Sequence, residues 1–366
     1  MRSLCLLAIL AFGLLLWPIT ASATLLYSGG ENIDFNCDAG GSCSSYTTAG
    51  TFRPGWARAA YRAFGTIVDP PTNRFATTTF TASPSLWTHA QYCSIYNSAC
   101  DLNATTANAQ MLRWMDSNNN AAVIVRGTGV SGSLKISSRT ATGTFSDLVT
   151  CPSAFGIALT QLDLFVNYST SGEVALYSNS VKVCGFTGDV TNGDGATTLN
   201  KVEFASPSSG YHGGWSEVII ATTDTRAMAR FTANTVANGN TVGFSGTNVC
   251  SAIWSSTSFN DASYGYSGSP NVLHLCTINS AVPPGAYNVL GLVMSARALV
   301  GSSGPQHFDF LTRTNGADYP SADFAPNNSF SNIANYIQTV NPATAAPWAV
   351  SDFQAAGFNV GEETKP

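Results

Sequence analysis

Short runs of alternating or β-branched residues, separated by glycine, asparagine, serine or proline, recur along most of this sequence. Such runs predict β-strands, and turns at this spacing are typical of β-sandwiches rather than of alternating βα units. Strands are expected over Arg74–Phe80, Ala121–Gly127, Leu134–Ser138, Gln161–Tyr168, Glu173–Ser178, Val181–Cys184, Lys201–Ala205, Ser216–Ala221, Met228–Ala233, Val272–Ile278, Tyr287–Ala298 and Phe308–Arg313. The sequence therefore predicts an all-β protein.

Local signals add a hairpin, one helix and a domain boundary. Ser178-Asn179-Ser180 is a turn sequence between two predicted strands. Thr106–Met115 fits one or two helical turns or a strand equally well, whereas Pro347–Ala356, closed by Gly357, predicts a helix. The polar segment Thr222–Arg226 suggests a boundary between domains at residues 24–222 and 223–366.

The N-terminus has the features of an export signal. Arg2 precedes an uncharged apolar run, Leu4–Leu16, and Ala21-Ser22-Ala23 is a small-x-small cleavage site. We expect residues 1–23 to be a cleaved signal peptide and the mature protein to be secreted or displayed at the cell surface, without a membrane span.

Nine cysteines occur in the chain, and eight of them follow the leader: Cys37, Cys43, Cys93, Cys100, Cys151, Cys184, Cys250 and Cys276. An even number in an exported chain indicates disulfides, although eight cysteines allow about 105 connectivities. The spacing suggests neighbour pairing, namely Cys37–Cys43, Cys93–Cys100, Cys151–Cys184 and Cys250–Cys276. Zinc is not expected, because no C-x-x-C pair occurs.

Charged residues make up only 10% of the chain, and the net charge is −5. Serine, threonine, asparagine and glycine take the polar positions, as is common in extracellular β-proteins. No cluster of lysine and arginine is visible in the linear sequence that would neutralise phosphates. Nucleic acid and anionic membranes are therefore not expected as partners.

The region from about Leu25 to Ala221 resembles a laminin G-like, or concanavalin A-like, jelly-roll domain. The resemblance rests on Leu162–Val166, Gly172–Tyr177, the Gly188-Asp189-Val190 turn, Lys201–Phe204 and Trp215–Ile220. It implies an N-terminal jelly-roll sandwich, which a second β-sandwich-like domain would follow.

The C-terminal region is similar to segments of bacterial and phage surface or tail proteins. Asn341–Trp348, Asp352-Phe353 and Gly357–Val360 carry this similarity. It implies a surface or filament context. Because phage structural proteins are not made with a cleaved export signal, the leader argues against a virion role.

Catalytic motifs are not found in the sequence. Glycosidases of the jelly-roll type carry E-x-D-x-x-E, in which one carboxylate attacks the sugar and another protonates the leaving group. None of the six glutamates lies in that motif. Glu203 and Glu217 fall on candidate neighbouring strands and could face one another. We expect them instead to be exposed strand residues. Gly265–Ser269 does not have the Gly-x-Ser-x-Gly spacing of a serine nucleophile. His274 alternates with apolar residues, so we expect its side chain to point to solvent. The prediction is that the protein is not an enzyme.

Asp189, Asn192 and Asp194 place three hard oxygen donors in one short loop. Their spacing does not match an EF-hand, so a Gly/Asp turn is the simpler interpretation, with calcium as the alternative. No other cofactor is expected.

Aromatic residues in glycine-rich and serine-rich segments are the candidate ligand contacts, with core packing as the alternative. The candidate ligand-binding residues are Tyr211, His212, Trp215, Trp254, Asn260, Asp261, Tyr264 and Tyr266. Sequence reasoning thus favours a non-catalytic recognition or adhesion protein for a glycan or a surface protein. The alternatives are a structural subunit of a filament, coat or phage-like particle, and a diverged glycoside hydrolase. The oligomeric state is left open.

Overall fold

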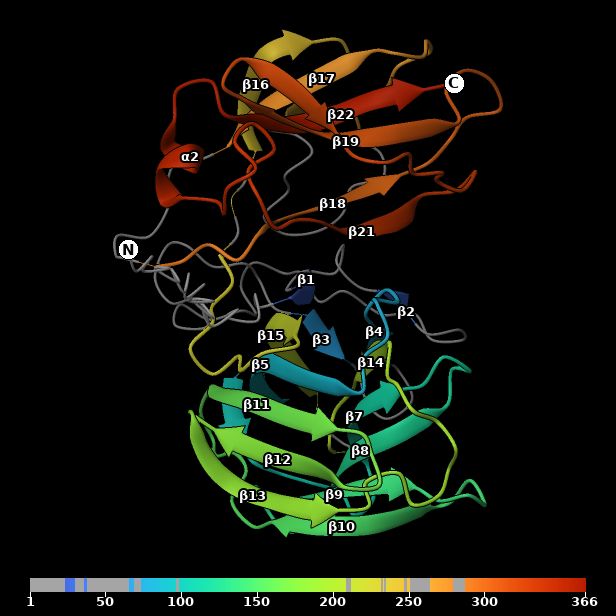
Figure 1. Ribbon diagram of the computed structural model, residues 1–366, viewed down its shortest axis with the longest axis vertical. Coiled ribbons are helices and arrows are strands. Elements are labelled where there is room, and N and C mark those ends of the chain that lie inside the picture. The colour runs from blue at the N-terminus through green and yellow to red at the C-terminus, as the bar shows by residue number, and fades with distance from the viewer. Residues whose placement is uncertain are drawn as a thin grey trace, which may run out of the picture.

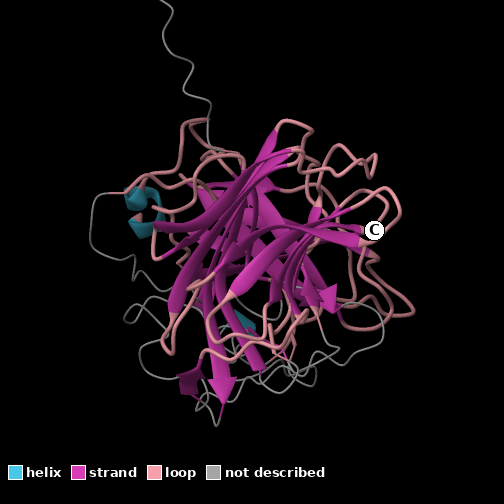
Figure 2. Ribbon diagram, turned by 90° about the horizontal axis from the view of Figure 1, so that it is seen from below, coloured by secondary structure: helices cyan, strands magenta, loops and turns pink. Residues whose placement is uncertain are grey.

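A computed structural model describes residues 24–29, 36–37, 66–68, 74–96, 99–208, 212–231, 233, 235–246, 249–250, 264–278 and 287–366. The predicted signal peptide, residues 1–23, lies outside the described residues. Within the described part, strands dominate and helix occurs only in short pieces (Figure 2). The fold is all-β, with antiparallel sheets in a sandwich-like arrangement, as predicted. No helix in this part is long and apolar enough to span a membrane.

Two antiparallel sheets form the N-terminal half (Figure 1). The eight-stranded sheet has, in order, β1 (Leu25–Gly29), β15 (His212–Ala221), β5 (Ser85–Tyr96), β11 (Thr160–Asn167), β12 (Gly172–Ser178) and β13 (Val181–Gly188), with β3 (Thr66–Val68) on β15 and β6 (Ala99–Leu102) on β5. The seven-stranded sheet has the order β10 (Phe145–Cys151), β9 (Leu134–Arg139), β8 (Ala121–Gly127), β7 (Gln110–Met115), β14 (Lys201–Phe204), β4 (Phe75–Ala76) and β2 (Asn36–Cys37).

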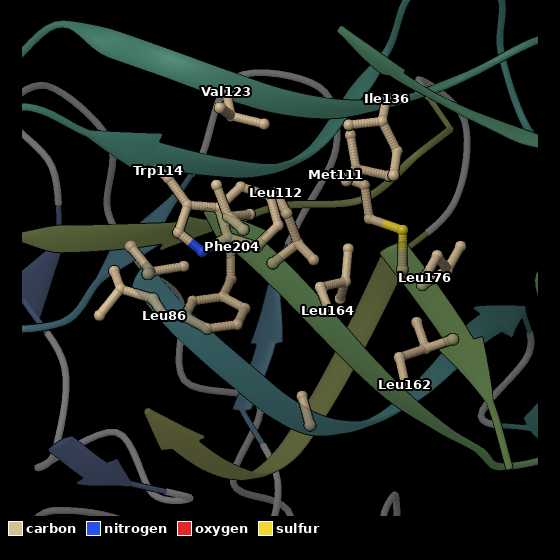
Figure 3. Close-up of a cluster of buried hydrophobic side chains, with 14 of the residues drawn as sticks. Leu86, Met111, Leu112, Trp114, Val123, Ile136, Leu162, Leu164, Leu176 and Phe204 are labelled. Carbon is tan, nitrogen blue, oxygen red and sulfur yellow. The ribbon is translucent and has the colours of Figure 1, made fainter. Parts of the chain in front are cut away.

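Apolar side chains fill the space between these two sheets (Figure 3). Because side chains alternate along a strand, Leu162 and Leu164 of β11 point inward on one side, and Val123 of β8 points inward on the other. Trp114 Nε1 donates to Thr88 Oγ1 at 3.0 Å, which ties one sheet to the other inside the core.

The C-terminal half contains a five-stranded sheet and a two-stranded sheet with a smaller aromatic core between them. The five strands, in order, are β16 (Thr235–Val242), β17 (Leu273–Ile278), β22 (Asn359–Lys365), β19 (His307–Thr314) and β20 (Ala317–Pro320), and the two are β18 (Leu292–Ala298) and β21 (Ser331–Gln338). Phe308 and Phe310 of β19 pack against Met294 of β18. A short helix, α2 (Val350–Gln354), precedes β22.

The two halves meet where β1 approaches β21 (Figure 1). The backbone N–H of Ser28 donates to Oδ1 of Asn335 at 2.8 Å. Asn335 has a φ of 66° at an irregularity in the β18–β21 pairing, and this turns its side chain toward β1. The division into domains at residues 24–222 and 223–366 stays a prediction.

Several predicted elements differ from the observed ones. Arg74–Phe80 forms a strand only at Phe75–Ala76, and Tyr287–Ala298 only from Leu292 onward. Met228–Phe231 is not a strand, because a turn closed by Met228 N–H on the Thr225 carbonyl precedes it. The ambiguous segment ending at Met115 is strand β7.

Two predicted disulfides are confirmed, Cys151–Cys184 and Cys250–Cys276. Cys151 ends β10 and Cys184 lies in β13, so the first disulfide links the outermost strands of the two N-terminal sheets. Cys93 is also disulfide-bonded. Its predicted partner Cys100 is described by its backbone alone, as is Cys37, while Cys43 lies outside the described residues. Disulfides of this kind are typical of proteins in oxidising compartments.

Candidate functional site

Two of the predicted ligand-contacting residues lie together on the surface of the C-terminal half. Tyr264 is 52% exposed and Tyr266 is 57% exposed, and their ring centroids are 6.2 Å apart. Phe330, immediately before β21, lies 5.6 Å from Tyr264 in an edge-on contact. We call Tyr264, Tyr266 and Phe330 the aromatic surface.

Backbone pairing holds the aromatic surface in place. Tyr266 and Ser245 exchange two backbone hydrogen bonds of 2.8 and 3.0 Å. Between the two tyrosines, Gly265 allows close packing, since a Cβ at this position would lie 2.3 Å from Cγ1 of Val249. Arg297 of β18 places its guanidinium 5.7 Å from the centre of the Phe330 ring and donates to Oδ1 of Asn332 at 2.9 Å.

This arrangement combines exposed ring faces with polar groups at their edge. Tyrosine and phenylalanine rings bury apolar area on contact with a ligand, and the tyrosine hydroxyls supply hydrogen bonds. Phe330 and Arg297 were not identified from the sequence, because their segments are more than thirty residues from Tyr264 along the chain. Of the other candidates, Tyr211, Trp254, Asn260 and Asp261 lie outside the described residues, and His212 is described by its backbone alone.

The prediction for Trp215 is wrong. Trp215 lies within β15, where it points into the core and is completely buried. Its ring packs against Tyr92 and Phe204, and Nε1 donates to the Ala205 carbonyl at 3.0 Å. A ligand therefore has no access to this ring.

The predicted calcium loop is closed by its own hydrogen bonds. Oδ1 of Asp189 accepts from Thr191 and Asn192, and Asn192 donates to Ser138. Oδ2 of Asp194 accepts from Nε of Arg139 at 2.9 Å. A cation bound to Asp194 would compete with Arg139, and calcium binding here stays a prediction.

Glu203 and Glu217 do not face one another, and the prediction that both are exposed strand residues is wrong. Glu203 is on β14 of the seven-stranded sheet and Glu217 on β15 of the eight-stranded sheet, so they do not lie on neighbouring strands. Both are 1% exposed. Glu203 is ion-paired with Arg113 and Lys201 at 3.0 and 3.1 Å.

Glu217 belongs to a buried polar cluster on the outer face of the eight-stranded sheet. Nδ1 of His89 donates to Oδ1 of Asp163 at 2.8 Å, and both side chains are completely buried. Nε2 of His89 lies 4.0 Å from Oε2 of Glu217. We call His89, Asp163 and Glu217 the polar cluster; the sequence did not reveal it, because it joins three strands distant in the chain.

The segment Thr222–Arg226, here called the strap, crosses this face of the sheet. Thr225 donates to Oδ1 of Asp163 at 2.8 Å, and Nε2 of Gln161 donates to the Arg226 carbonyl at 2.9 Å. The Arg226 guanidinium lies 4.5 Å from the centre of the Tyr177 ring and 5.5 Å from that of Trp87. The strap, which the sequence suggested as a domain boundary, therefore follows β15 directly and lies over the polar cluster.

His274 is buried, contrary to the prediction that it points to solvent. Its Nδ1 accepts from the Phe244 backbone N–H at 3.2 Å, and Nε2 lies 3.2 Å from Sγ of Cys250. Burial lowers the pKa of His274. Cys250, His274 and Cys276 lie close enough to share a metal ion, but the two cysteines form a disulfide, which removes their thiolates as ligands.

Comparisons with known proteins give only distant similarities. No protein-family model and no curated protein matches the sequence. Among solved structures, domain 4 of the extracellular arabinanase AbnA from Geobacillus stearothermophilus, in complex with arabinotriose, is 14% identical, with a TM-score of 0.34 over 55% of this chain and 93% of that one. An endo-β-1,4-glucuronan lyase from Trichoderma reesei is 8% identical, with a TM-score of 0.30 over 46% and 96%.

A structure described as HCR/D-Sa-GBL1/C is 10% identical, with a TM-score of 0.37 over 94% of both chains. All three TM-scores lie below 0.5 and all three identities below 25%. The resemblance to laminin G-like domains stays a prediction.

Proposed function

We propose that this protein is a secreted, non-catalytic recognition protein that binds a glycan through its aromatic surface. The observation that carries the proposal is the contact between two tyrosines that are each more than half exposed. Single exposed aromatics are common, but a group of rings in mutual contact on the surface is typical of a binding site. Sugars offer apolar ring faces for stacking and hydroxyl groups for hydrogen bonds, which suits tyrosine.

The positions of Glu203 and Glu217, the two glutamates considered from the sequence, support a non-catalytic role. A glycosidase pair needs two carboxyl groups flanking the scissile bond at about 5–10 Å. Glu203 and Glu217 lie on different sheets, and Glu203 is ion-paired with Arg113 and Lys201. The disulfides support an extracellular location.

A glycan array probed with the purified mature chain tests the proposal, followed by titration of the best glycan against Tyr266→Ala. We expect a loss of about 1–3 kcal/mol in binding free energy, by analogy with base–aromatic stacking, at an unchanged melting temperature. Phe231→Ala is the matched control, because Phe231 is 41% exposed and contacts Tyr287 rather than the aromatic surface. Equal effects of the two substitutions, or no glycan bound, would contradict the proposal.

A structural subunit of a larger assembly is the second candidate, and the edge strand β16 favours it. Among the described strands, β16 has one neighbour, β17, and it exposes Val236 and Val242. Exposed edge strands are templates for pairing with another chain. Light scattering over a concentration series would show assembly that Val236→Lys abolishes; a concentration-independent monomer would exclude this candidate.

A further inference from the structure

The outer face of the seven-stranded sheet carries a row of side chains that crosses five strands and is polar except for the buried Ile124 at its centre. In the strand register, Glu203 lies opposite Arg113, Arg113 opposite Ile124, Ile124 opposite Ser137, and Ser137 opposite Asp147. The residues on either side of each, such as Val123 and Ile136, point into the core. With neighbouring strands about 4.8 Å apart, the backbone positions of Glu203 and Asp147 at the two ends of the row are separated by roughly 19 Å across the sheet.

Each of these two carboxylates is held by two cations. Asp147 lies 2.5 Å from Nη2 of Arg126 and 3.0 Å from Nζ of Lys135. Glu203 lies 3.0 Å from Nη1 of Arg113 and 3.1 Å from Nζ of Lys201. We call the first group the Asp147 triplet and the second the Glu203 triplet.

Each triplet leaves one positive charge in excess, in a chain whose net charge is −5. The four cationic side chains are recessed, at 13% to 20% exposed. Charges in such surroundings are screened less by solvent and salt than charges on freely exposed lysines. The next cation on β9, Arg139, is ion-paired with both Asp116 and Asp194, so that group carries one negative charge in excess, and the positive excess on the described strands of this sheet is confined to the two triplets.

The Asp147 triplet is not the arrangement that sheet stability alone would favour. Arg126 and Lys135 lie directly opposite one another on β8 and β9, and like charges in that position are destabilising. Asp147 offsets the repulsion: burial alone would raise its pKa, but hydrogen bonds from Ser137, Arg126 and Lys135 lower it to about 2. In the Glu203 triplet, the buried Nε of Arg113 has no hydrogen-bond partner among the described residues.

The geometry points to a second binding site on this face, for an acidic polysaccharide whose carboxylate or sulfate groups contact both triplets. Arginine presents five N–H donors in a planar fork that suits carboxylate and sulfate, and Arg126 commits only Nε and Nη2 to Ser137 and Asp147. A polymer with repeated anionic groups reaches both triplets at once, which raises its effective concentration at the second triplet after the first contact. This site lies on a different sheet from the aromatic surface and is independent of it.

Binding to immobilised polysaccharides tests the inference, with a polyuronate, a sulfated polysaccharide and a neutral polysaccharide as probes. We expect both acidic polymers to bind, with an affinity that falls as salt rises, and the neutral polymer not to bind through this face. The double variant Arg126→Gln/Lys135→Gln should weaken acidic binding at least tenfold. Asp147→Asn removes the negative charge of the Asp147 triplet and should strengthen the binding of acidic polymers. A loss of folding cannot produce such an increase.

The matched control is Lys182→Gln, which removes a cation paired with Glu173 on the eight-stranded sheet and should leave acidic binding unchanged. Comparing the polyuronate with the sulfated polymer identifies which anionic group is preferred. Equal binding of duplex DNA would reduce the site to unspecific charge attraction and overturn the inference. An unchanged affinity for acidic polysaccharide in Arg126→Gln/Lys135→Gln would also overturn it. The same holds if Tyr266→Ala lowers this affinity and the double variant does not.

Discussion

Nδ1 of His89 lies 2.8 Å from Oδ1 of Asp163 beneath the strap, and neither side chain reaches solvent. The same carboxylate accepts from Thr225 and Gln161, so three residues from three segments converge on Asp163. A buried carboxylate is tolerated when it is hydrogen-bonded in this way, and the site is sensitive to the loss of any partner.

Asp163→Ala should therefore lower the free energy of unfolding by about 3–5 kcal/mol, the usual effect of removing one partner of a buried pair. Chemical denaturation measures it. Glu173→Ala is the matched control, because Glu173 pairs with Lys182 at an exposed position and should change stability by less than about 1 kcal/mol. Similar values for the two variants would show that the polar cluster does not stabilise the sheet.

Arg226 fixes the strap to the sheet. Its guanidinium lies over Tyr177 and Trp87 and is held by Asp224 at 2.5 Å. Arg226→Ala should cost about 1–2 kcal/mol, and Arg226→Lys less, because lysine keeps the charge but loses the planar stacking. Hydrogen exchange over residues 222–228 should become faster in the alanine variant. Unchanged exchange would mean that the hydrogen bonds of Thr225 and Gln161 secure the strap without the Arg226 side chain.

The Cys151–Cys184 disulfide joins the outermost strands of the two N-terminal sheets, closing a loop with a sequence separation of 33 residues. Replacing both cysteines by serine should cost about 3–4 kcal/mol in the chain-entropy model. It should also expose the edges of β10 and β13 to aggregation. Melting temperature and light scattering measure the two effects. The disulfide of Cys93, predicted from the sequence to close a short loop, should contribute less to stability than Cys151–Cys184. A larger fall in melting temperature in Cys93→Ser than in the double variant would contradict this prediction.

Local features of the fold were predictable from the sequence. Ala121–Gly127 is the strand predicted, because its run of apolar and β-branched residues is buried. The turn between β12 and β13 was predicted from Ser178-Asn179-Ser180, and Asn179 and Ser180 both have positive φ values, as a tight hairpin requires.

Features that depend on distant segments were not predictable. Gly213 and Gly214 made the segment before Trp215 glycine-rich, which is why Trp215 was a candidate ligand contact. Both glycines lie within β15, where Gly213 passes so close to the Ala205 backbone that a Cβ would be 2.9 Å from its carbonyl oxygen. Glu217 sits at an irregularity with a φ of 53°, which breaks the simple alternation of faces. His89 and Asp163 are 74 residues apart, and only the pairing of β5 with β11 brings them together.

Glu362 makes the stability of the C-terminal half dependent on pH. It lies opposite His274 and Phe310 in the register of the five-stranded sheet, on the face that carries the aromatic core. Burial raises its pKa to about 7, so the folded protein holds this proton more tightly than the unfolded chain. The contribution of this bound proton to folding stability is complete below about pH 4.5 and is lost as the pH rises through 7.

His274, with its lowered pKa, changes stability with pH in the opposite direction, so the difference between wild type and the Glu362 variant is the readout. Glu362→Gln should remove a fall of about 1–3 kcal/mol in the free energy of unfolding between pH 4.5 and 7.5. The neighbouring Glu363→Gln is the control, because Glu363 is ion-paired with Lys365 at 2.8 Å. If Glu362→Gln keeps the wild-type slope, this carboxyl group titrates as an ordinary solvent-exposed glutamate.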